Sequence, residues 1–260
     1  RVLFRSFTHR VMHSWRDAAE RIAEQFVDSF PATGPVDLVR DWAAPLPMAV
    51  ICEILGVPFD DRDSFTVWGN ILASGLDRPR SVAHARQMDE AARSLTDYLA
   101  RLLDERRRQP EDDLLSTLAA VEIDGDVLTD RDIIGTSSFL LIAGFETTVN
   151  LLGAGTRVLM EHSDQFAEVS ADPDLIPALT EEALRYVSPV QYTFRTALAD
   201  IDLPTGARLN ERETIVLILA GANRDPEVFI DPDRFDVHRD NARRHLALDR
   251  KSTRLNSSHA

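Results

Sequence analysis

The stretch IIGTSSFLLIAGFETTVNLLGAG, residues 133–155, is apolar on almost every side of a helix. A helix with this pattern is expected to run through a protein core, because it leaves no polar face for water. Thr129 and Asp132 form a plausible capping pair ahead of it. The sequence therefore predicts one long, buried helix that begins near Thr129 and ends at about Met160.

The middle of this helix carries polar side chains where packing alone favours none. Glu146, Thr147 and Thr148 follow closely after Gly144. A glycine lets another group approach the backbone, and a carboxylate beside a hydroxyl can transfer protons, which would be a functional arrangement. Alternatively, the motif is a satisfied polar kink in which a threonine bonds back to the preceding turn. The motif alone leaves both interpretations open.

The rest of the chain is predicted to be mainly helical, with a small β portion near the C-terminus. Turn signals occur at Asp124-Gly125, and Gly206 and Asn210 separate short extended pieces. Apolar residues at helical spacing, bounded by glycine, proline and capping residues, predict further helices. These cover residues 11–30, 46–55, 61–75, 174–187 and a long helix capped by Ser81, whose basic end at 106–108 suits a helix C-terminus.

The composition is that of an ordinary globular protein. A formal charge of -14 argues against nucleic acid or an anionic membrane as a partner. We find no uninterrupted apolar run of about 18 residues and no export leader, so we expect no membrane span and a cytoplasmic protein. The single cysteine, Cys52, lies in the apolar helical stretch AVICEILG, which predicts a buried, inert thiol.

Two further motifs carry charges at suggestive spacings. Glu182 and Arg185 lie three residues apart on one predicted helix, close enough to pair, although this spacing is also common in solvated salt bridges. Arg195 lies in the alternating stretch YTFRTA, where its guanidinium could bind an anionic group or simply face water. The segment ANRDPEVFIDPDRFD, by itself, indicates only a structured loop.

The order of these motifs is more specific than any one of them. AGFETT, EEALR, SPVQYTFRTA, GANRDPEVF, DPDRFD and HLAL follow one another along the chain. In this order the sequence resembles a soluble bacterial cytochrome P-450 from about Phe7 to Leu248. The resemblance implies a truncated cytochrome P-450 fold, a helical bundle around a long central helix with a small β portion near the C-terminus.

The resemblance also implies roles for individual residues. Glu146 and Thr147 would be the catalytic acid and alcohol that deliver protons for cleavage of dioxygen. Ala143 and Gly144 would line the distal face of a haem, and Arg195 would hold a haem propionate.

The substrate pocket and a buried support follow from the same resemblance. Glu182 and Arg185 would form a buried pair, joined by an arginine from the later loop. Arg234 matches that arginine best, with Arg239 as the fallback. The residues implied to line the substrate pocket are Phe139, Leu140, Val190, Gln191, Tyr192, Thr193 and Phe194.

The implied function is that of a haem-dependent monooxygenase. Such an enzyme inserts one atom of dioxygen into a small organic substrate, uses haem b with its iron, and receives electrons from a ferredoxin-type or flavoprotein donor. Two alternatives stay open. One is an oxidative coupling enzyme on the same scaffold, and the other is a non-catalytic helical remnant that binds no haem.

The pattern breaks where the family places its iron ligand. After HLAL the family continues with a glycine-rich loop that ends in a cysteine, and counting from His245 places this cysteine at Leu255. Thr253 stands at the histidine position of the loop, and Asp249 and Lys251 stand at its two glycines. We therefore expect no axial cysteine and no metal ligand in this chain, which would then retain no haem and be inactive.

Both ends of the chain match translated adapters of sequencing libraries. RVLFRS at the start and DRKSTRLNSSH near the end are what such adapter strands encode. We therefore expect residues 1–6 and 249–260 to be adapter-derived and residues 7–248 to be a partial cytochrome P-450 domain, a fragment without the family's N-terminal region.

Overall fold

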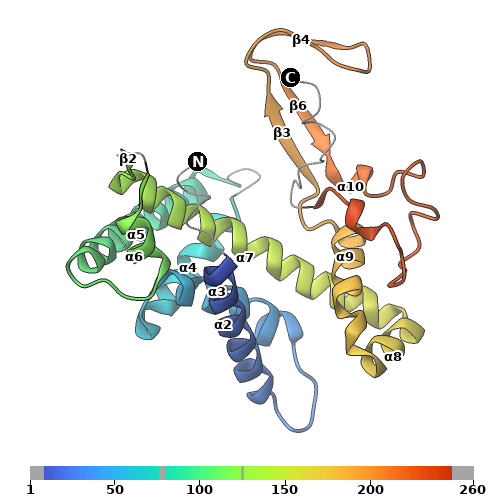
Figure 1. Ribbon diagram of the computed structural model, residues 1–260, viewed down its shortest axis with the longest axis horizontal. Helices are drawn as coiled ribbons and strands as arrows, with labels where there is room; N and C mark the ends of the chain where they lie inside the picture. The colour runs from blue at the N-terminus through green and yellow to red at the C-terminus, as the bar shows by residue number, and fades with distance from the viewer. Residues whose placement is uncertain (1–8, 76–79, 124–125, 248–260) are drawn as a thin grey trace. The chain divides into compact units, whose positions relative to one another are not determined.

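The structure, a computed structural model, describes residues 9–75, 80–123 and 126–247 (Figure 1). It divides into two compact units, and the boundary falls within one long helix. The first unit ends at Val149 and the second begins at Asn150. The predicted adapter-derived ends, residues 1–6 and 249–260, lie outside the described residues, as does the turn at Asp124-Gly125.

The first unit is built from helices, most of which the sequence predicted. Ser81 accepts a hydrogen bond from the His84 amide and so begins the long helix, and Gly56, at φ 74°, ends another. The short helix α6 and the hairpin β1–β2 were not predicted. The elements are α2 (His9–Asp28), η1 (Val39–Ala43), α3 (Pro45–Leu55), η2 (Phe59–Asp61), α4 (Arg62–Ala73), α5 (Val82–Arg108), α6 (Leu114–Ala120), β1 (Glu122–Ile123), β2 (Asp126–Val127) and the first part of α7 (Asp130–Glu161).

The second unit combines short helices with two small antiparallel sheets. In one sheet β3 pairs with β6, in a register that places Tyr192 opposite Ile218, and in the other β4 pairs with β5. The prediction of a mainly helical chain with a small β portion near the C-terminus is confirmed. After α7 come α8 (Ser163–Ala171), η3 (Pro173–Leu175), α9 (Ile176–Val187), β3 (Tyr192–Thr196), β4 (Ile201–Asp202), β5 (Arg208–Leu209), β6 (Thr214–Ile218), α10 (Leu219–Ala222) and η4 (Ala242–Arg244).

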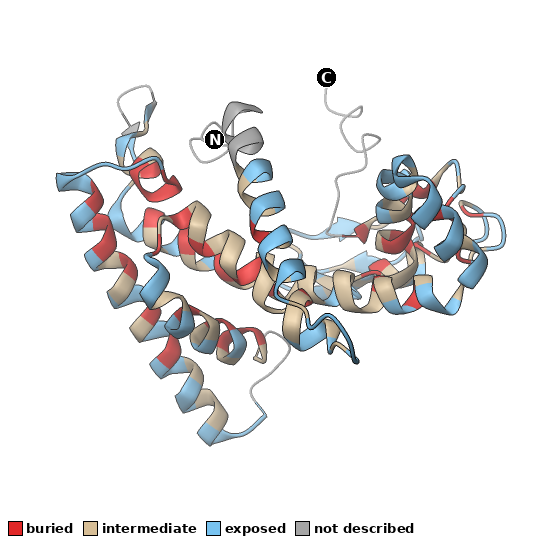
Figure 2. Ribbon diagram, turned by 90° about the horizontal axis from the view of Figure 1, so that it is seen from below, coloured by how far each residue is buried: buried red, intermediate tan, exposed pale blue. Residues whose placement is uncertain are grey.

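The core of the first unit collects the apolar stripes of α3, α4, α5, α6 and α7 (Figure 2). Phe65 packs edge-on against Tyr98, with ring centroids 5.0 Å apart, and Trp68 lies beside both rings. Tyr98 donates a hydrogen bond to Asp61, so its buried ring keeps a partner for its hydroxyl. Cys52 is fully buried in this core, as the sequence predicted.

Within the first unit, helix α7 is buried along one stripe, so the prediction of burial on all sides is wrong. Ile133, Ser137, Leu141 and Phe145 recur at four-residue spacing and are buried. Phe139, on another face, is 67% exposed. An apolar pattern all round a helix shows that it can be covered everywhere, but neighbouring elements decide which faces are covered. In this chain they cover the stripe that faces the first core.

By length and composition, α7 could also cross a membrane, contrary to the expectation from apolar runs alone. Its 32 residues have a mean hydropathy of 1.3 over the most apolar window. The same test is passed by core helices of soluble proteins. In this structure 17% of that window is buried, and the buried stripe of α7 packs into the core of the first unit.

A buried arginine joins three elements of the first unit. Arg106 is only 4% exposed, and its guanidinium pairs with Asp113 and donates to the carbonyl oxygen of Gly56 at 2.8 Å. Asp113 also accepts from the Ser116 amide and caps α6. The basic end of α5 thus does more than suit a helix terminus, because it ties α5 to α3 and α6. Gly56 leaves the room, since a Cβ there would collide with Asp113.

We expect Asp113→Ala to lower the free energy of unfolding of the first unit by about 3 kcal/mol, because the buried guanidinium of Arg106 loses its one buried carboxylate partner and α6 loses its cap. All three tryptophans, Trp15, Trp42 and Trp68, lie in this unit, so tryptophan fluorescence during urea unfolding measures the effect. The matched control is Asp130→Ala, which removes the exposed partner of Arg107 and should change little. Equal effects of the two variants would contradict the assignment.

Candidate functional site

The predicted catalytic pair lies on the first-unit part of α7. Thr129 and Asp132 cap this helix reciprocally, as predicted, and the Asp132 carboxylate accepts from the Thr129 hydroxyl at 2.6 Å. Glu146 and Thr147 are adjacent and half-buried. The Thr147 hydroxyl donates to the carbonyl oxygen of Ala143 at 2.8 Å. This is the bond to the preceding turn that the sequence left open as a structural interpretation.

Gly144 faces another helix in the first unit. A Cβ added at Gly144 would lie 3.1 Å from Cδ1 of Ile51 on α3, which is tighter than ordinary contact. The close approach that this glycine permits is therefore a helix–helix contact. Phe139 and Leu140, which were predicted to line a substrate pocket, differ in exposure, since Phe139 is exposed and Leu140 is half-buried.

A fully buried ion pair lies on α9 in the second unit. Glu182 and Arg185 both have side chains that are 0% exposed, and Nε of Arg185 lies 2.7 Å from Oε2 of Glu182. The second contact of the pair joins Nη2 to Oε1 at 2.8 Å, so the pairing is bidentate. The spacing thus forms a fully buried pair and not a solvated one.

Every N–H group of the Arg185 guanidinium has an acceptor. Besides Glu182, the acceptors are the carbonyl oxygens of Asn223, Pro232 and Arg234, at 2.8–3.0 Å. A guanidinium has five such hydrogens, and five bonds are made. Complete pairing is what makes a buried charge tolerable, and it fixes the loop that supplies the carbonyls.

The third member of this network is Arg239, so the choice of Arg234 is corrected. Nε of Arg239 lies 3.2 Å from Oε1 of Glu182, and its side chain is 7% exposed. Its remaining donors bind the carbonyl oxygens of Ile230, Asp231 and Arg234. Arg234 contributes only its carbonyl oxygen, while its side chain is exposed.

Arg195 and the predicted pocket residues of the second unit lie on or before β3. Nη1 of Arg195 donates to Oγ1 of Thr193 and to the carbonyl oxygen of Phe194. Tyr192 and Phe194 lie on the exposed face of the β3–β6 ribbon, 39% and 56% exposed. Gln191 donates to the carbonyl oxygen of Val187, and Val190 is half-buried.

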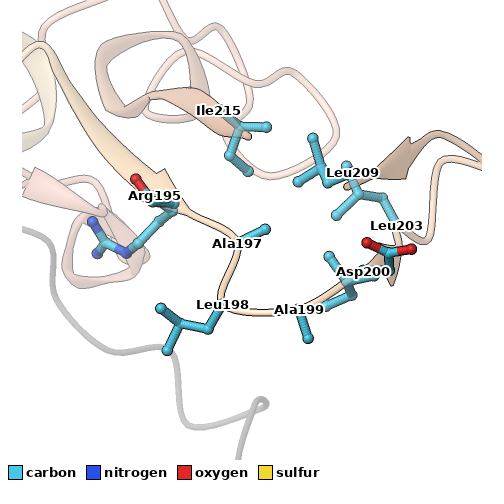
Figure 3. Close-up of a pocket in the computed structure, with 10 residues that line it drawn as sticks. Arg195, Ala197, Leu198, Ala199, Asp200, Leu203, Leu209 and Ile215 are labelled. Carbon is cyan, nitrogen blue, oxygen red and sulfur yellow. The ribbon is translucent and has the colours of Figure 1, made fainter. Parts of the chain in front are cut away.

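An open groove of about 420 Å³ lies at the end of the β3–β6 ribbon that holds Thr196 and Ile215 (Figure 3). Its lining is mostly apolar, and Asp200 lies at one side. In Figure 3 the Arg195 guanidinium extends away from Leu203 and Leu209. Of the predicted site residues only Arg195 contributes to this groove. The lining comprises Arg195, Thr196, Ala197, Leu198, Ala199, Asp200, Ile201, Leu203, Leu209 and Ile215.

The residues of this chain do not fit an iron held by a cysteine thiolate. The single cysteine, Cys52, lies fully buried in the apolar core of the first unit, and burial raises the pKa of its thiol to about 12. Among the described residues no group of three or more histidine, cysteine and acidic side chains could hold a metal ion. Leu255, Thr253, Asp249 and Lys251, which stand in the ligand loop of the family, lie outside the described residues.

The residue that the sequence interpretation missed is Asn223. It stands in ANRDP, a stretch whose sequence indicates only a structured loop, yet it is 0% exposed. Its carboxamide nitrogen donates to Oγ of Ser188, a buried residue at φ 49° that ends α9. A buried asparagine needs partners for both polar atoms. The asparagine at the start of a proline-containing turn segment was the available sign, but it does not reveal burial.

The correction at Arg239 can be tested against Arg234. We expect Arg239→Ala to destabilise the second unit by about 2–3 kcal/mol, because buried acceptors lose their donors. Arg234→Ala is the matched control and should stay within about 0.5 kcal/mol, since its carbonyl oxygen remains. Hydrogen exchange of the α9 amides gives the local free energy, and a larger effect at Arg234 would reverse the assignment.

The state of Cys52 predicts slow thiol chemistry. Burial raises the pKa of the Cys52 thiol, so the folded state favours the neutral thiol. The contribution of this thiol to the free energy of unfolding is complete below the unfolded cysteine pKa of about 8.5 and is lost as the pH rises from there towards 12. We expect an aromatic disulfide reagent at pH 8 to label the folded chain slowly and the urea-unfolded chain rapidly. Cys52→Ser gives the background, and rapid labelling of the folded chain would disprove burial.

Comparisons with known proteins agree with the order of motifs. A family model described as cytochrome P-450 matches residues 172–252. The vitamin D(3) 25-hydroxylase of Pseudonocardia autotrophica is 42% identical over 91% of this chain and 57% of that protein. The 6-deoxyerythronolide B hydroxylase of Saccharopolyspora erythraea is 38% identical over 95% of this chain and 60% of that protein.

Solved structures show the same likeness. A cytochrome P-450 from Chondromyces apiculatus matches 95% of this chain and 60% of its own, with a TM-score of 0.85 and 36% identity. A cytochrome P-450 from Bacillus megaterium, solved with testosterone, matches 95% of this chain and 66% of its own, with a TM-score of 0.86 and 34% identity. The chain spans 57% and 60% of the lengths of the two curated relatives above. With this fold, these motifs and more than a third of its residues identical to such relatives, the chain belongs to the cytochrome P-450 family.

Proposed function

We propose that the chain is part of a haem-dependent monooxygenase that inserts one oxygen atom into a small organic substrate. The observation that supports this most strongly is the buried Glu182–Arg185 pair with Arg239. This network brings the EEALR, ANRDP and DPDRFD motifs together in the order that the family uses. Two similar proteins are named as hydroxylases, which agrees with oxygen insertion.

The proposal includes roles for residues that keep the type the chemistry needs. Glu146 and Thr147 would handle protons, and Arg195 would meet an anionic edge of the cofactor. The single cysteine, Cys52, is buried, so the roles proposed for these residues are limited to proton transfer and binding. The remaining contacts proposed are Ala143 and Gly144 toward the cofactor and Phe139, Leu140, Val190, Gln191, Tyr192, Thr193 and Phe194 toward the substrate.

The proposal also covers the setting of the whole protein. Electrons would come from a ferredoxin-type or flavoprotein donor, and the location would be cytoplasmic. Residues 7–248 would be the cytochrome P-450 portion, with residues 1–6 and 249–260 derived from adapters. A thiolate loop that directly follows Leu248 in the parent gene would then supply the iron ligand.

A second candidate function is that the 260-residue chain is a non-catalytic protein that binds no haem. The observation that favours it is Cys52, which is the single cysteine and is buried as a neutral thiol. A neutral thiol within an apolar core cannot ligate iron. The two candidates therefore differ in one feature, the sequence that follows Leu248 in the source gene.

The deciding experiment is to sequence the source DNA across the codon for Leu248, with primers that carry no library adapter. We expect a glycine-rich loop with a cysteine ten residues after His245. If the source DNA itself encodes DRKSTRLNSSH after Leu248, the monooxygenase proposal fails and the haem-free candidate stands.

A companion measurement uses the two proteins directly. The 260-residue chain and the longer protein encoded by the parent gene are each mixed with haem, reduced and exposed to carbon monoxide. The longer protein should give the absorption band of a thiolate-ligated iron, because its loop supplies the cysteine, and the 260-residue chain should not. A thiolate band from the 260-residue chain would contradict the assignment of Cys52 as a buried, neutral thiol.

A further inference from the structure

We propose that Asn223 is a positioning residue that holds the backbone of residues 245–247 against the end of α9. Asn223 follows α10 directly and is completely buried. The His245 N–H donates to the carbonyl oxygen of Ala242, whereas the N–H groups of Leu246 and Ala247 donate to side chains. Asn223 supplies one of these bonds at Leu246, from a position 23 residues earlier in the chain.

Both ends of the Asn223 side chain are committed. Its Oδ1 accepts the Leu246 N–H at 2.7 Å, and its Nδ2 donates to Oγ of Ser188 at 2.8 Å. The orientation of the amide follows from its partners, because a backbone N–H can only donate. Ser188 donates its own hydrogen to the carbonyl oxygen of Arg185 and so has a lone pair left to accept. No other arrangement satisfies the three groups together.

The main chain of Asn223 is fixed as well. Its carbonyl oxygen accepts from Nη1 of Arg185 at 2.9 Å, and its N–H donates to the carbonyl oxygen of Leu219. The same residue therefore contacts the buried ion pair with its backbone and the segment 245–247 with its side chain.

A second side chain secures the next amide of the segment. Nδ1 of His245 accepts the Ala247 N–H at 3.1 Å, which places the ring hydrogen on Nε2, directed at Oε2 of Glu181 at 3.1 Å. His245 is 4% exposed. Ser188, at the end of α9, orients Asn223, which holds Leu246. Glu181, on α9, orients His245, which holds Ala247.

The contact has a consequence for chemistry only through the proposed function. In that function the chain beyond Leu248 leads to the iron ligand, so the placement of residues 245–247 would set where that loop begins. The positioning claim itself concerns hydrogen bonds within the described residues. It can therefore fail while the monooxygenase proposal stands, and the reverse also holds.

The test is hydrogen exchange at the Leu246 amide in the full chain. We expect Asn223→Ala to speed exchange there by about tenfold or more, because the amide loses its acceptor. Exchange of the α9 amides should change by less than about threefold. Asn223→Asp should restore most of the protection, since one oxygen still accepts from Leu246 while the Ser188 hydroxyl can turn to donate to the other.

The matched control is Asn241→Ala. Asn241 also donates from its carboxamide to a loop carbonyl, that of Val228, but it does not contact Leu246 through this group. We expect this variant to leave Leu246 exchange unchanged. The proposal is overturned if Asn223→Ala leaves Leu246 exchange unchanged, or if Asn241→Ala speeds it equally. It is also overturned if Asn223→Ala and Asn223→Asp both speed α9 and Leu246 together, because that would indicate a general loss of the fold.

Discussion

The second unit depends on the burial of one ion pair. Moving an arginine and a glutamate out of water costs several kcal/mol for each charge unless all of their hydrogen bonds are replaced. Glu182 and Arg185 meet this condition only because residues 223–239 close around them and present carbonyl oxygens and a second arginine. The loop has little regular structure, so its backbone conformation is set by the hydrogen bonds that its carbonyl oxygens accept from the buried pair.

The strain in that loop follows from the same constraint. Asp231 adopts φ 47°, which a residue other than glycine rarely does. Its carbonyl oxygen accepts from Arg239, and that of the next residue, Pro232, accepts from Arg185. Two successive carbonyls must point at two different guanidinium groups, and the left-handed turn lies where they do so. The hydrogen bonds to charged donors offset the cost of the unusual backbone.

What could be predicted from the sequence was local. Ser81 and Thr129 mark helix starts by their own chemistry, and the spacing of Glu182 and Arg185 allows only a contact on one helix face. Which of two nearby arginines, Arg234 or Arg239, joins the pair depends on the path of a loop, and spacing carries no information about that path. Similarly, Gly144 allowed a ligand or a helix as neighbour, and its contact with Ile51 of α3 could not be predicted because it depends on how the two helices pack.

The polar network of the second unit needs no cofactor to be complete. The five donors of Arg185 bind protein acceptors, and Oε1 of Glu182 also accepts the Asp236 amide. A buried charge with an unfilled partner would need a ligand for stability, whereas this one does not. The scaffold that supports the proposed iron site can therefore persist in a chain whose one thiol is buried elsewhere. The buried pair and the loop around it are satisfied by this chain's own residues, independently of the thiolate that the proposed chemistry needs.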